Sequence, residues 1–175
     1  GGWYKSAVDF AQASELMVGM GGNRFAPDTE TTRAMVIQVL YAFADKPSVE
    51  GMTCPLTDVA PDAWYADAVT WGYNLGVTSG YEDNTFRPDT VISRQELAVM
   101  ICGMLFGDDS ILIEDDIKLA LSAFEDGDQI ASWAREAVAV CYISGLMVGD
   151  NNGCFRPNAG LTRAELAQVF CALYR

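Results

Sequence analysis

The stretch FRPNAGLTRAEL, residues 155–166, carries the features that decide how the rest of this chain folds. Thr162 followed three residues later by Glu165 matches the S/T-x-x-E capping box that opens a helix. Arg163 then falls in the first helical turn, where the macrodipole already places positive charge and favours carboxylates. The position of this arginine therefore requires an explanation.

The same pattern occurs three times in the chain. Residues 3–41, 64–102 and 133–171 align without a gap, with phenylalanine 22 residues after the first tryptophan, proline two residues later, and arginine eight residues after the phenylalanine. Identical spacing in three copies indicates internal repeats. The matching residues are Trp3, Trp64 and Trp133; Phe25, Phe86 and Phe155; Pro27, Pro88 and Pro157; and Arg33, Arg94 and Arg163.

Each copy predicts a helix, a loop and a second helix. The first helix is expected to begin at the tryptophan, with Trp64, Ala68, Trp71 and Leu75 forming an apolar stripe in the middle copy. A stretch rich in Gly, Asn, Asp and Pro follows, which predicts a loop. The phenylalanine of each loop is expected to bind the loop to the core.

The second helix is expected to begin after Thr32, Ser93 or Thr162 as N-cap. Glu96 and Glu165 complete capping boxes in copies two and three, whereas copy one has Met35 in that position. These helices then carry apolar residues at the i, i+3, i+4, i+7 spacing of one face. The faces are Val36, Val39, Leu40 and Phe43; Leu97, Met100, Ile101 and Met104; and Leu166, Val169, Phe170 and Leu173.

Helices this short cannot bury such faces alone. We therefore expect a mainly α fold in which three helix-loop-helix units share one central core in a pseudo-threefold arrangement. Residues 44–63 and 107–132 are the seams between copies, and the second is expected to contain a short helical stretch at 114–124. Asp58 and Asp126 stand a few residues before Trp64 and Trp133, and Trp3 has no equivalent aspartate before it.

Composition excludes several functional classes. The chain of 175 residues has 24 acidic and 11 basic residues, a formal charge of −13, which argues against nucleic-acid binding and against affinity for anionic membranes. It has no histidine, so imidazole zinc sites and Ser-His or Cys-His nucleophiles are absent. No stretch approaches the roughly 20 apolar residues of a membrane span. The Gly1-Gly2 start suggests a fragment of a longer protein.

The five cysteines fit neither a zinc knuckle nor a complete disulfide framework. Cys102 and Cys171 occupy matching positions on apolar helix faces, which favours a role as small core residues over a role in a disulfide. Cys154 falls in a loop, where it is either reactive or paired. The acidic loops lack the spacing of a calcium loop, and the glycines of VGMGGN, residues 18–23, do not form a dinucleotide-binding motif.

These motifs together resemble the S-layer homology repeat, which usually occurs in threes. The resemblance rests on an aspartate before the first helix, W-Y-x-x-A-V at its start, F-x-P in the loop and T-R-A-E at the second helix. LTRAEL in copy three matches best, ISRQEL is a variant, and TTRAMV has lost the glutamate. The resemblance predicts repeat 1 at residues 1–47, repeat 2 at 48–107 and repeat 3 at 108–175, forming one cooperative domain.

The resemblance also implies a fold and a function. Members of the family form a three-pronged spindle and anchor bacterial surface proteins to the cell wall. They bind secondary cell-wall polysaccharide, often with an acidic pyruvyl ketal, in grooves between the prongs, and the arginine of T-R-A-E contacts the saccharide. We therefore expect an extracellular module within a larger secreted protein, needing no cofactor or metal.

Arg163 now has two candidate explanations. It is either a solvated surface charge beside a capping box or, with Arg33 and Arg94, one of three residues that bind an anion. Its presence in all three copies favours the second, with the free N–H groups of the helix N-terminus adding to the attraction. The hypothesis is that each arginine pairs with a carboxylate of an acidic sugar, while the acidic background repels anions elsewhere.

The remaining site candidates also keep two interpretations. Trp3, Trp64 and Trp133 either anchor the helices in the core or stack on sugar rings, and Tyr81 is a weaker candidate for ligand contact. Asp58, Asp126, Glu96 and Glu165 complete the predicted carbohydrate site. A glycan hydrolase would need two carboxylates facing across a cleft, but the capping boxes account for Glu96 and Glu165 without catalysis. Carbohydrate anchoring is thus favoured over a protein-interaction or self-assembly module.

Overall fold

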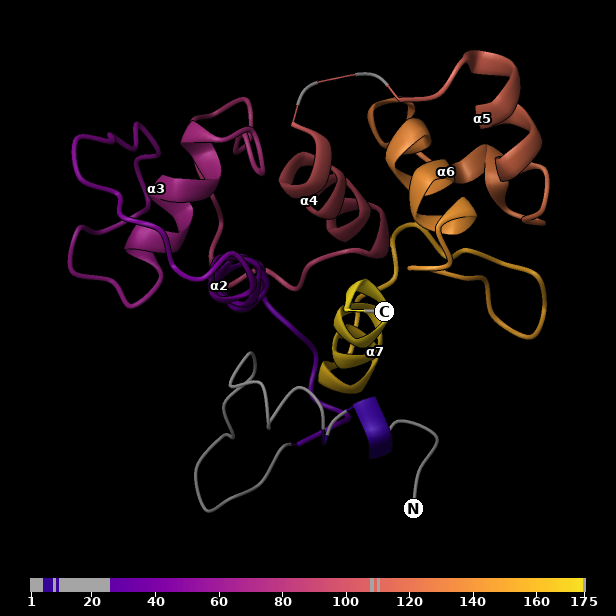
Figure 1. The fold of residues 1–175 in the computed structure, drawn as a ribbon, viewed down its shortest axis with the longest axis horizontal. Coiled ribbons are helices and arrows are strands. Elements are labelled where there is room, and N and C mark those ends of the chain that lie inside the picture. The colour runs from indigo at the N-terminus through magenta and orange to yellow at the C-terminus, as the bar shows by residue number, and fades with distance from the viewer. Residues whose placement is uncertain (1–4, 8, 10–25, 108, 110, 175) are drawn as a thin grey trace.

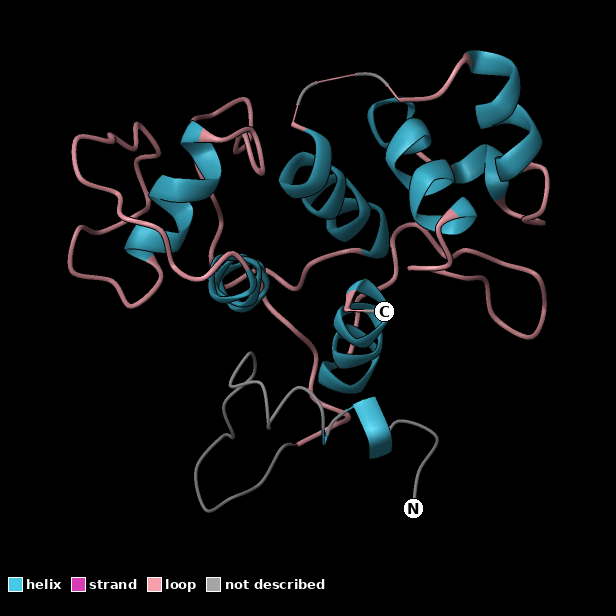
Figure 2. Cartoon of the chain, viewed as in Figure 1, coloured by secondary structure: helices cyan, strands magenta, loops and turns pink. Residues whose placement is uncertain are grey.

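The computed structural model describes residues 5–7, 9, 26–107, 109 and 111–174. The α-helices that carry labels in Figure 1 are α2 (Arg33–Phe43), α3 (Ala66–Asn74), α4 (Arg94–Phe106), α5 (Glu114–Leu121), α6 (Arg135–Ile143) and α7 (Arg163–Leu173). Two 3-10 turns, η1 (Gly127–Gln129) and η2 (Ser132–Ala134), precede α6. The described residues form no β-strand (Figure 2), so the prediction of a mainly α fold is confirmed. None of the helices described is long and apolar enough to span a membrane.

The second helix of each copy begins where its capping residues place it. Ser93 and Glu96 form a complete capping box at α4, and Thr162 and Glu165 form one at α7. Thr32 caps α2 by accepting a hydrogen bond from the Met35 N–H, without a box. The cap predictions are therefore confirmed in all three copies, including the difference in copy one.

Helices α2, α4 and α7 lie around the centre of the molecule (Figure 1), and their buried apolar residues belong to one hydrophobic cluster. Leu40, Ile101 and Phe170, at equivalent positions on the three helices, are completely buried. Phe86 and Phe155 of the loops are also completely buried, which confirms that these loops are bound to the core. Phe25 lies outside the described residues.

Backbone hydrogen bonds join the copies in a closed ring. The first helical residue of each second helix donates its N–H to a carbonyl of the next copy at 2.9 Å, and the second helical residue donates to the carbonyl of that copy's repeated proline. The pairs are Arg33 to Thr90, Arg94 to Ala159 and Arg163 to Thr29, with Ala34 to Pro88, Gln95 to Pro157 and Ala164 to Pro27. Isolated bridges at Thr32–Val91, Ser93–Gly160 and Glu30–Thr162 repeat the same connections. Copy one thus contacts copy two, copy two contacts copy three, and copy three contacts copy one.

The first helices of copies two and three begin later than predicted. α3 begins at Ala66 and α6 at Arg135, two residues after the tryptophan in each case. Ala68 and Trp71 are buried as expected, and the Trp71 ring lies 5.5 Å from that of Tyr41 on α2. The predicted ends of the stripe are wrong, because Trp64 and Leu75 both lie outside the helix and are exposed.

The second seam contains the short helix α5, in the region where the sequence indicates weak helical character. α5 packs against α6, with Ile117, Ala120 and Leu121 buried.

Helix α4 approaches the turn after α3 so closely that a Cβ on Gly103 would lie 2.5 Å from the carbonyl oxygen of Gly76. Glycine at position 103 is therefore a requirement of the packing. The boundaries of the three repeats at residues 47 and 107 stay a prediction.

Candidate functional site

The Arg33 side chain crosses from the first turn of α2 to the second copy. Its Nε donates to the carbonyl oxygen of Phe86 at 2.7 Å, and its Nη1 donates to Glu96 Oε1 at 3.0 Å. The guanidinium carbon lies 4.7 Å from the ring centroid of Tyr81 and 4.8 Å from that of Phe86. These contacts provide the negative and π-electron partners that compensate for the unfavourable macrodipole.

Arg94 makes the equivalent connection from copy two to copy three. Its Nε donates to the Phe155 carbonyl oxygen at 2.7 Å, and its Nη2 donates to the Val148 carbonyl oxygen at 2.8 Å. Arg33, Arg94 and Arg163 are all buried, with 4%, 8% and 5% of each residue exposed. The interpretation of these arginines as solvated surface charges is therefore wrong.

The structure corrects the expectation of free N–H groups at the helix N-termini. The first two N–H groups of α2, α4 and α7 donate to carbonyls of the neighbouring copy. The third N–H group, that of Met35, Glu96 or Glu165, donates to the side-chain oxygen of the N-cap residue. An anion bound near these helices would therefore interact with the arginine side chain rather than with the backbone.

Asp58 and Asp126 hold the loops that the arginines contact. The two carboxylate oxygens of Asp58 accept the N–H groups of Phe86 and Arg87, both at 2.7 Å. Asp126 binds Phe155 and Arg156 in the same way and at the same distances. Both aspartates are thus occupied by backbone, and they fix the peptide whose carbonyl accepts the arginine Nε.

Arg87 and Arg156 themselves adopt a left-handed backbone, with φ of 58° and 57°. The equivalent Ala26 has φ of 51°, so all three F-x-P loops use the same unusual conformation. Non-glycine residues adopt it only when surrounding contacts maintain it, and the aspartate carboxylates provide such contacts in copies two and three.

Arg33 also lines a cavity of about 750 Å³, which we call groove A. Its walls combine residues of all three copies: Arg33 from the first, Tyr81, Arg87 and Glu96 from the second, and Trp133 from the third. Tyr81 donates from its hydroxyl to Glu96 Oε1 at 2.6 Å, and the Arg87 guanidinium carbon lies 3.8 Å from the Tyr81 ring centroid. Groove A therefore presents aromatic surface beside two arginines, each of which is paired with a carboxylate, Arg33 with Glu96 and Arg87 with Asp83.

The charge of Glu96 is maintained by its neighbours. Burial opposes ionisation, but hydrogen bonds from Tyr81 and Ser93 and the charge of Arg33 outweigh it and lower the pKa of the carboxyl group. Burial, together with the hydrogen bond to Glu96, raises the pKa of Tyr81. Arg33 and Glu96 thus form an ion pair, while Tyr81 remains a neutral hydroxyl donor.

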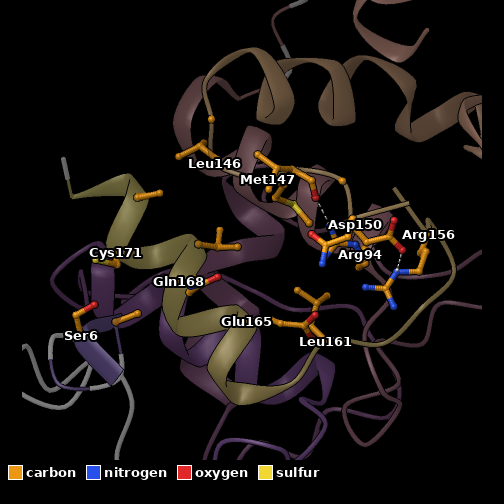
Figure 3. Close-up of a pocket in the computed structure, with 17 residues that line it drawn as sticks. Ser6, Arg94, Leu146, Met147, Asp150, Arg156, Leu161, Glu165, Gln168 and Cys171 are labelled. Atoms are coloured by element: carbon orange, nitrogen blue, oxygen red, sulfur yellow. Dashed lines mark hydrogen bonds and ion pairs between the residues drawn. The ribbon is translucent and has the colours of Figure 1, made fainter. Parts of the chain in front are cut away.

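A second cavity of about 520 Å³, groove B, surrounds Arg94 (Figure 3). Glu165, Gln168 and Cys171 line it from α7, while Leu146, Met147 and Asp150 line it from the loop after α6. Arg156 Nε lies 3.2 Å from Asp150 Oδ2. Asp150 occupies the position equivalent to Tyr81 in groove A, so the two grooves differ chemically at matching positions.

Arg94 differs from Arg33 in its ionic partners. Within the described residues, Arg33 has a carboxylate oxygen at 3.0 Å, whereas the two hydrogen-bond acceptors of the Arg94 side chain are neutral carbonyls. Burial lowers the pKa of Arg94, and the nearby charge of Glu165 partly offsets this effect. Groove B therefore contains an arginine whose charge is less neutralised by direct contact.

Arg33 and Arg94 each have one guanidinium nitrogen that is accessible to solvent. Arg33 Nη2 and Arg94 Nη1 have no hydrogen-bond partner among the described residues. No buried side-chain nitrogen or oxygen in that part of the chain lacks a partner, so these two nitrogens are accessible. Arg163, by contrast, has a further interaction partner.

The tryptophans that the structure describes at the start of the first helices are not core residues. Trp64 and Trp133 are 62% and 59% exposed, so the core interpretation is wrong for both. Trp133 lines groove A, whereas Trp64 lines neither groove A nor groove B. Trp3 lies outside the described residues.

The arrangement offers hydrogen bonding, ring stacking and positive charge rather than a reaction centre. Glu96 lines groove A and Glu165 lines groove B, and each is part of a capping box. The described part of the chain contains no cluster of three or more His, Cys, Asp or Glu residues suited to a metal ion. Arg87 and Arg156 were missed in the sequence, although the F-R-P triplet places a cation beside the loop phenylalanine in copies two and three.

Comparison with known proteins agrees with the repeat structure. The S-layer homology domain family matches residues 1–34, 55–98 and 123–167. The chain is 26% identical over 175 residues to an amylopullulanase of Thermoanaerobacterium thermosulfurigenes. The matched region covers 98% of this chain and 9% of that protein. It is 38% identical over 122 residues to a cell surface protein of Thermoanaerobacter kivui, covering 69% of the chain and 16% of the relative.

A cellulosome-anchoring protein of Acetivibrio thermocellus is 29% identical over 153 residues, covering 86% of the chain and 33% of the relative. The chain thus spans a minor part of the length of these proteins. The surface and anchoring proteins among these relatives confirm the expected location at the bacterial cell surface. With family matches in all three copies, the chain belongs to the S-layer homology domain family.

Proposed function

We propose that this chain is a non-catalytic module that anchors a larger protein to the bacterial cell wall by binding secondary cell-wall polysaccharide. The observation that carries the proposal is the pair of buried arginines that each line a groove between copies and each have one guanidinium nitrogen without a hydrogen-bond partner among the described residues. The relatives named as cell surface and cellulosome-anchoring proteins support the anchoring role.

Groove A would bind the sugar rings. The exposed face of Trp133 provides a stacking surface, and the Tyr81 oxygen can accept a hydrogen bond from a sugar hydroxyl while its own O–H is donated to Glu96. Arg33 would add a donor through Nη2, but its ion pair with Glu96 makes the immediate charge of this site close to neutral. The chemistry of groove A therefore suits a neutral part of the polymer.

Groove B would bind the acidic substituent, which we propose is a pyruvyl ketal. Arg94 Nη1 has no ionic partner at contact distance among the described residues. Arg156 could exchange its contact with Asp150 for one with a ligand carboxylate, because half of the Arg156 side chain is exposed. A carboxylate entering the groove would gain a charge-assisted hydrogen bond from Arg94. The −13 charge of the chain would repel anions that do not reach these arginines.

The alternative function is a protein-interaction or self-assembly module, in which acidic side chains of a partner occupy the same grooves. The observation that favours it is the exposure of two apolar residues, Trp133 and Phe106, which line a smaller cavity together, Trp133 also lining groove A. Oligomers that form with increasing concentration in the absence of polymer would support this alternative.

The proposal is tested by calorimetric titration with purified wall polysaccharide, before and after mild acid removes the pyruvyl ketals. Trp133→Ala should weaken binding of both polymers, since its target is the sugar ring. Arg94→Ala should weaken binding of the ketal-bearing polymer by roughly 10- to 100-fold, as expected for losing a hydrogen bond to a charged group. Leu119→Ala, an exposed apolar position on α5 outside both grooves, is the control. Equal binding of both polymers by the unchanged protein would contradict the role of the ketal.

A further inference from the structure

Cys102 on α4 and Cys141 on α6 face each other across the contact between these helices. The Cys102 sulfur lies 3.6 Å from the carbonyl oxygen of Ala137, and the Cys141 sulfur lies 3.9 Å from that of Ala98. Ala137 precedes Cys141 by one helical turn, and Ala98 precedes Cys102 by one turn. Each thiol therefore reaches across to the turn that carries the other thiol.

The helices approach closely at this point because the contact is made of small residues. Ala98 is completely buried and Ala137 nearly so, while Cys141 is completely buried and Cys102 half-buried. Each sulfur therefore lies against the backbone of the facing helix. Disulfide formation requires Cβ atoms within about 3.5–4.5 Å, a separation that helices reach when small residues face each other.

The two thiols differ in accessibility and acidity. Cys102 lines a surface cavity of about 220 Å³, next to Trp133 and Glu136, whereas Cys141 is closed to solvent. The neighbouring Cys141 thiol lowers the pKa of Cys102, against the opposing effects of burial and the Glu136 charge. The same interaction and burial raise the pKa of Cys141. A lowered pKa, access and a neighbouring thiol are the properties of an oxidation-sensitive cysteine.

The pair is confined to one junction between copies. At the equivalent junction of α2 with α3, the matching positions hold Tyr41 and Gly72. Cys171 matches Cys102 in the third copy and is only partly buried. The facing cysteines are therefore a particular feature of the contact between copies two and three.

We propose that Cys102 and Cys141 form an oxidation site in which Cys102 reacts first and Cys141 completes a disulfide that links α4 to α6. The Cys102 thiolate attacks one sulfur of a small-molecule disulfide, forming a mixed disulfide and releasing one thiolate. The Cys141 thiol then loses its proton and attacks the Cys102 sulfur, which releases the second thiolate. The small-molecule disulfide gains the two electrons that the protein thiols lose. A cell-surface location supplies the oxidising surroundings in which such bonds persist.

The cavity also predicts which disulfide reacts best. Asp109 and Glu136 are acidic residues at the cavity that Cys102 lines. They would attract a cationic reagent and repel an anionic one. Cystamine should therefore modify Cys102 faster than oxidised glutathione at equal concentration, and the difference should decrease at high salt.

The experiment incubates the reduced chain with cystamine and follows its products by intact mass and peptide mapping. Cys54→Ser, Cys154→Ser and Cys171→Ala are introduced together, so that only the proposed pair remains. We expect both thiols to be lost, a Cys102–Cys141 linked peptide, and a higher melting temperature that reverts on reduction. With Cys141→Ser added, the reaction should stop at a cysteamine adduct on Cys102. With Cys102→Ser added, Cys141 should stay unmodified.

A stable adduct on Cys102 in the presence of Cys141 would overturn the proposal, as would two free thiols after the incubation. Modification of Cys141 in the Cys102→Ser variant would also overturn it, because Cys141 would then react without a prior reaction at Cys102. The peptide map reports the linkage independently of wall binding, so failure of the anchoring function would leave this test unaffected.

Discussion

Arg94 Nε donates to the carbonyl oxygen of Phe155 at 2.7 Å, and through this contact the first turn of α4 is attached to the loop of the next copy. Asp126 binds the N–H of the same phenylalanine at 2.7 Å. The equivalent contacts in copy two involve Arg33, Phe86 and Asp58. The repeated arginine therefore has a structural role in addition to the proposed role in binding.

Asp126→Asn should lower the free energy of unfolding by about 1–3 kcal/mol, because two hydrogen bonds to a buried carboxylate are lost or weakened. Asp58→Asn should act in the same direction, and denaturant titration measures both. Glu125→Gln, at an exposed neighbouring position, is the matched control. A stability equal to that of the unchanged protein would show that the carboxylates do not hold the loops.

Gly103→Ala should destabilise the fold even though alanine favours helix by about 1 kcal/mol. Its Cβ would lie 2.5 Å from the Gly76 carbonyl oxygen and 2.9 Å from the Val77 Cα, so backbone must move. Gly72→Ala is the comparison, since its closest contact is the flexible end of the Ile37 side chain at 2.7 Å. Thermal unfolding should show the larger loss for position 103, and the reverse order would contradict the packing described.

The ion pair of Arg33 and Glu96 should make stability depend on acid pH. The pKa of Glu96 is lower in the folded state than its ordinary value of 4.5. Its contribution is therefore complete above about pH 4.5 and disappears as the pH falls through the lowered value. As the pH falls through this acid range, the Glu96→Gln variant should lose less stability than a control variant with the exposed substitution Glu50→Gln. Identical pH profiles for the two variants would argue against this contribution.

The two described grooves should not contribute equally to anion binding. Arg94→Ala should weaken binding of the acidic polymer more than Arg33→Ala, because Glu96 already neutralises Arg33 at 3.0 Å. Titration with the ketal-bearing polysaccharide measures the difference, with circular dichroism to verify folding. Equal losses for Arg33 and Arg94 would refute the ranking.

The sequence was sufficient to predict the helices whose signals are local. Capping boxes, apolar spacing and the three aligned copies predicted α2, α4 and α7, and all three begin where their N-cap residues stand. Local patterns also predicted burial of Phe86 and Phe155. These features depend on neighbours within one or two helical turns, which a sequence displays directly.

The partners of the arginines could not be predicted in the same way. Arg33 contacts Phe86 and Glu96, residues 53 and 63 positions away, and the carbonyl acceptors have no sequence signature. Trp64 and Trp133 were misplaced because the helix begins two residues later than the tryptophan, which leaves these rings exposed to solvent. The facing of Cys102 and Cys141 likewise depends on how α4 and α6 pack.

The most direct test of the account is sedimentation of the chain with purified cell walls, before and after hydrogen fluoride removes their secondary polysaccharide. Arg94→Ala and the more conservative Arg156→Gln are compared with Lys118→Gln, which removes one exposed positive charge outside grooves A and B. The account predicts that binding disappears on stripped walls, decreases for both groove variants while they remain folded, and is unchanged for the control. Undiminished binding to stripped walls, or equal binding by folded groove variants, would contradict it.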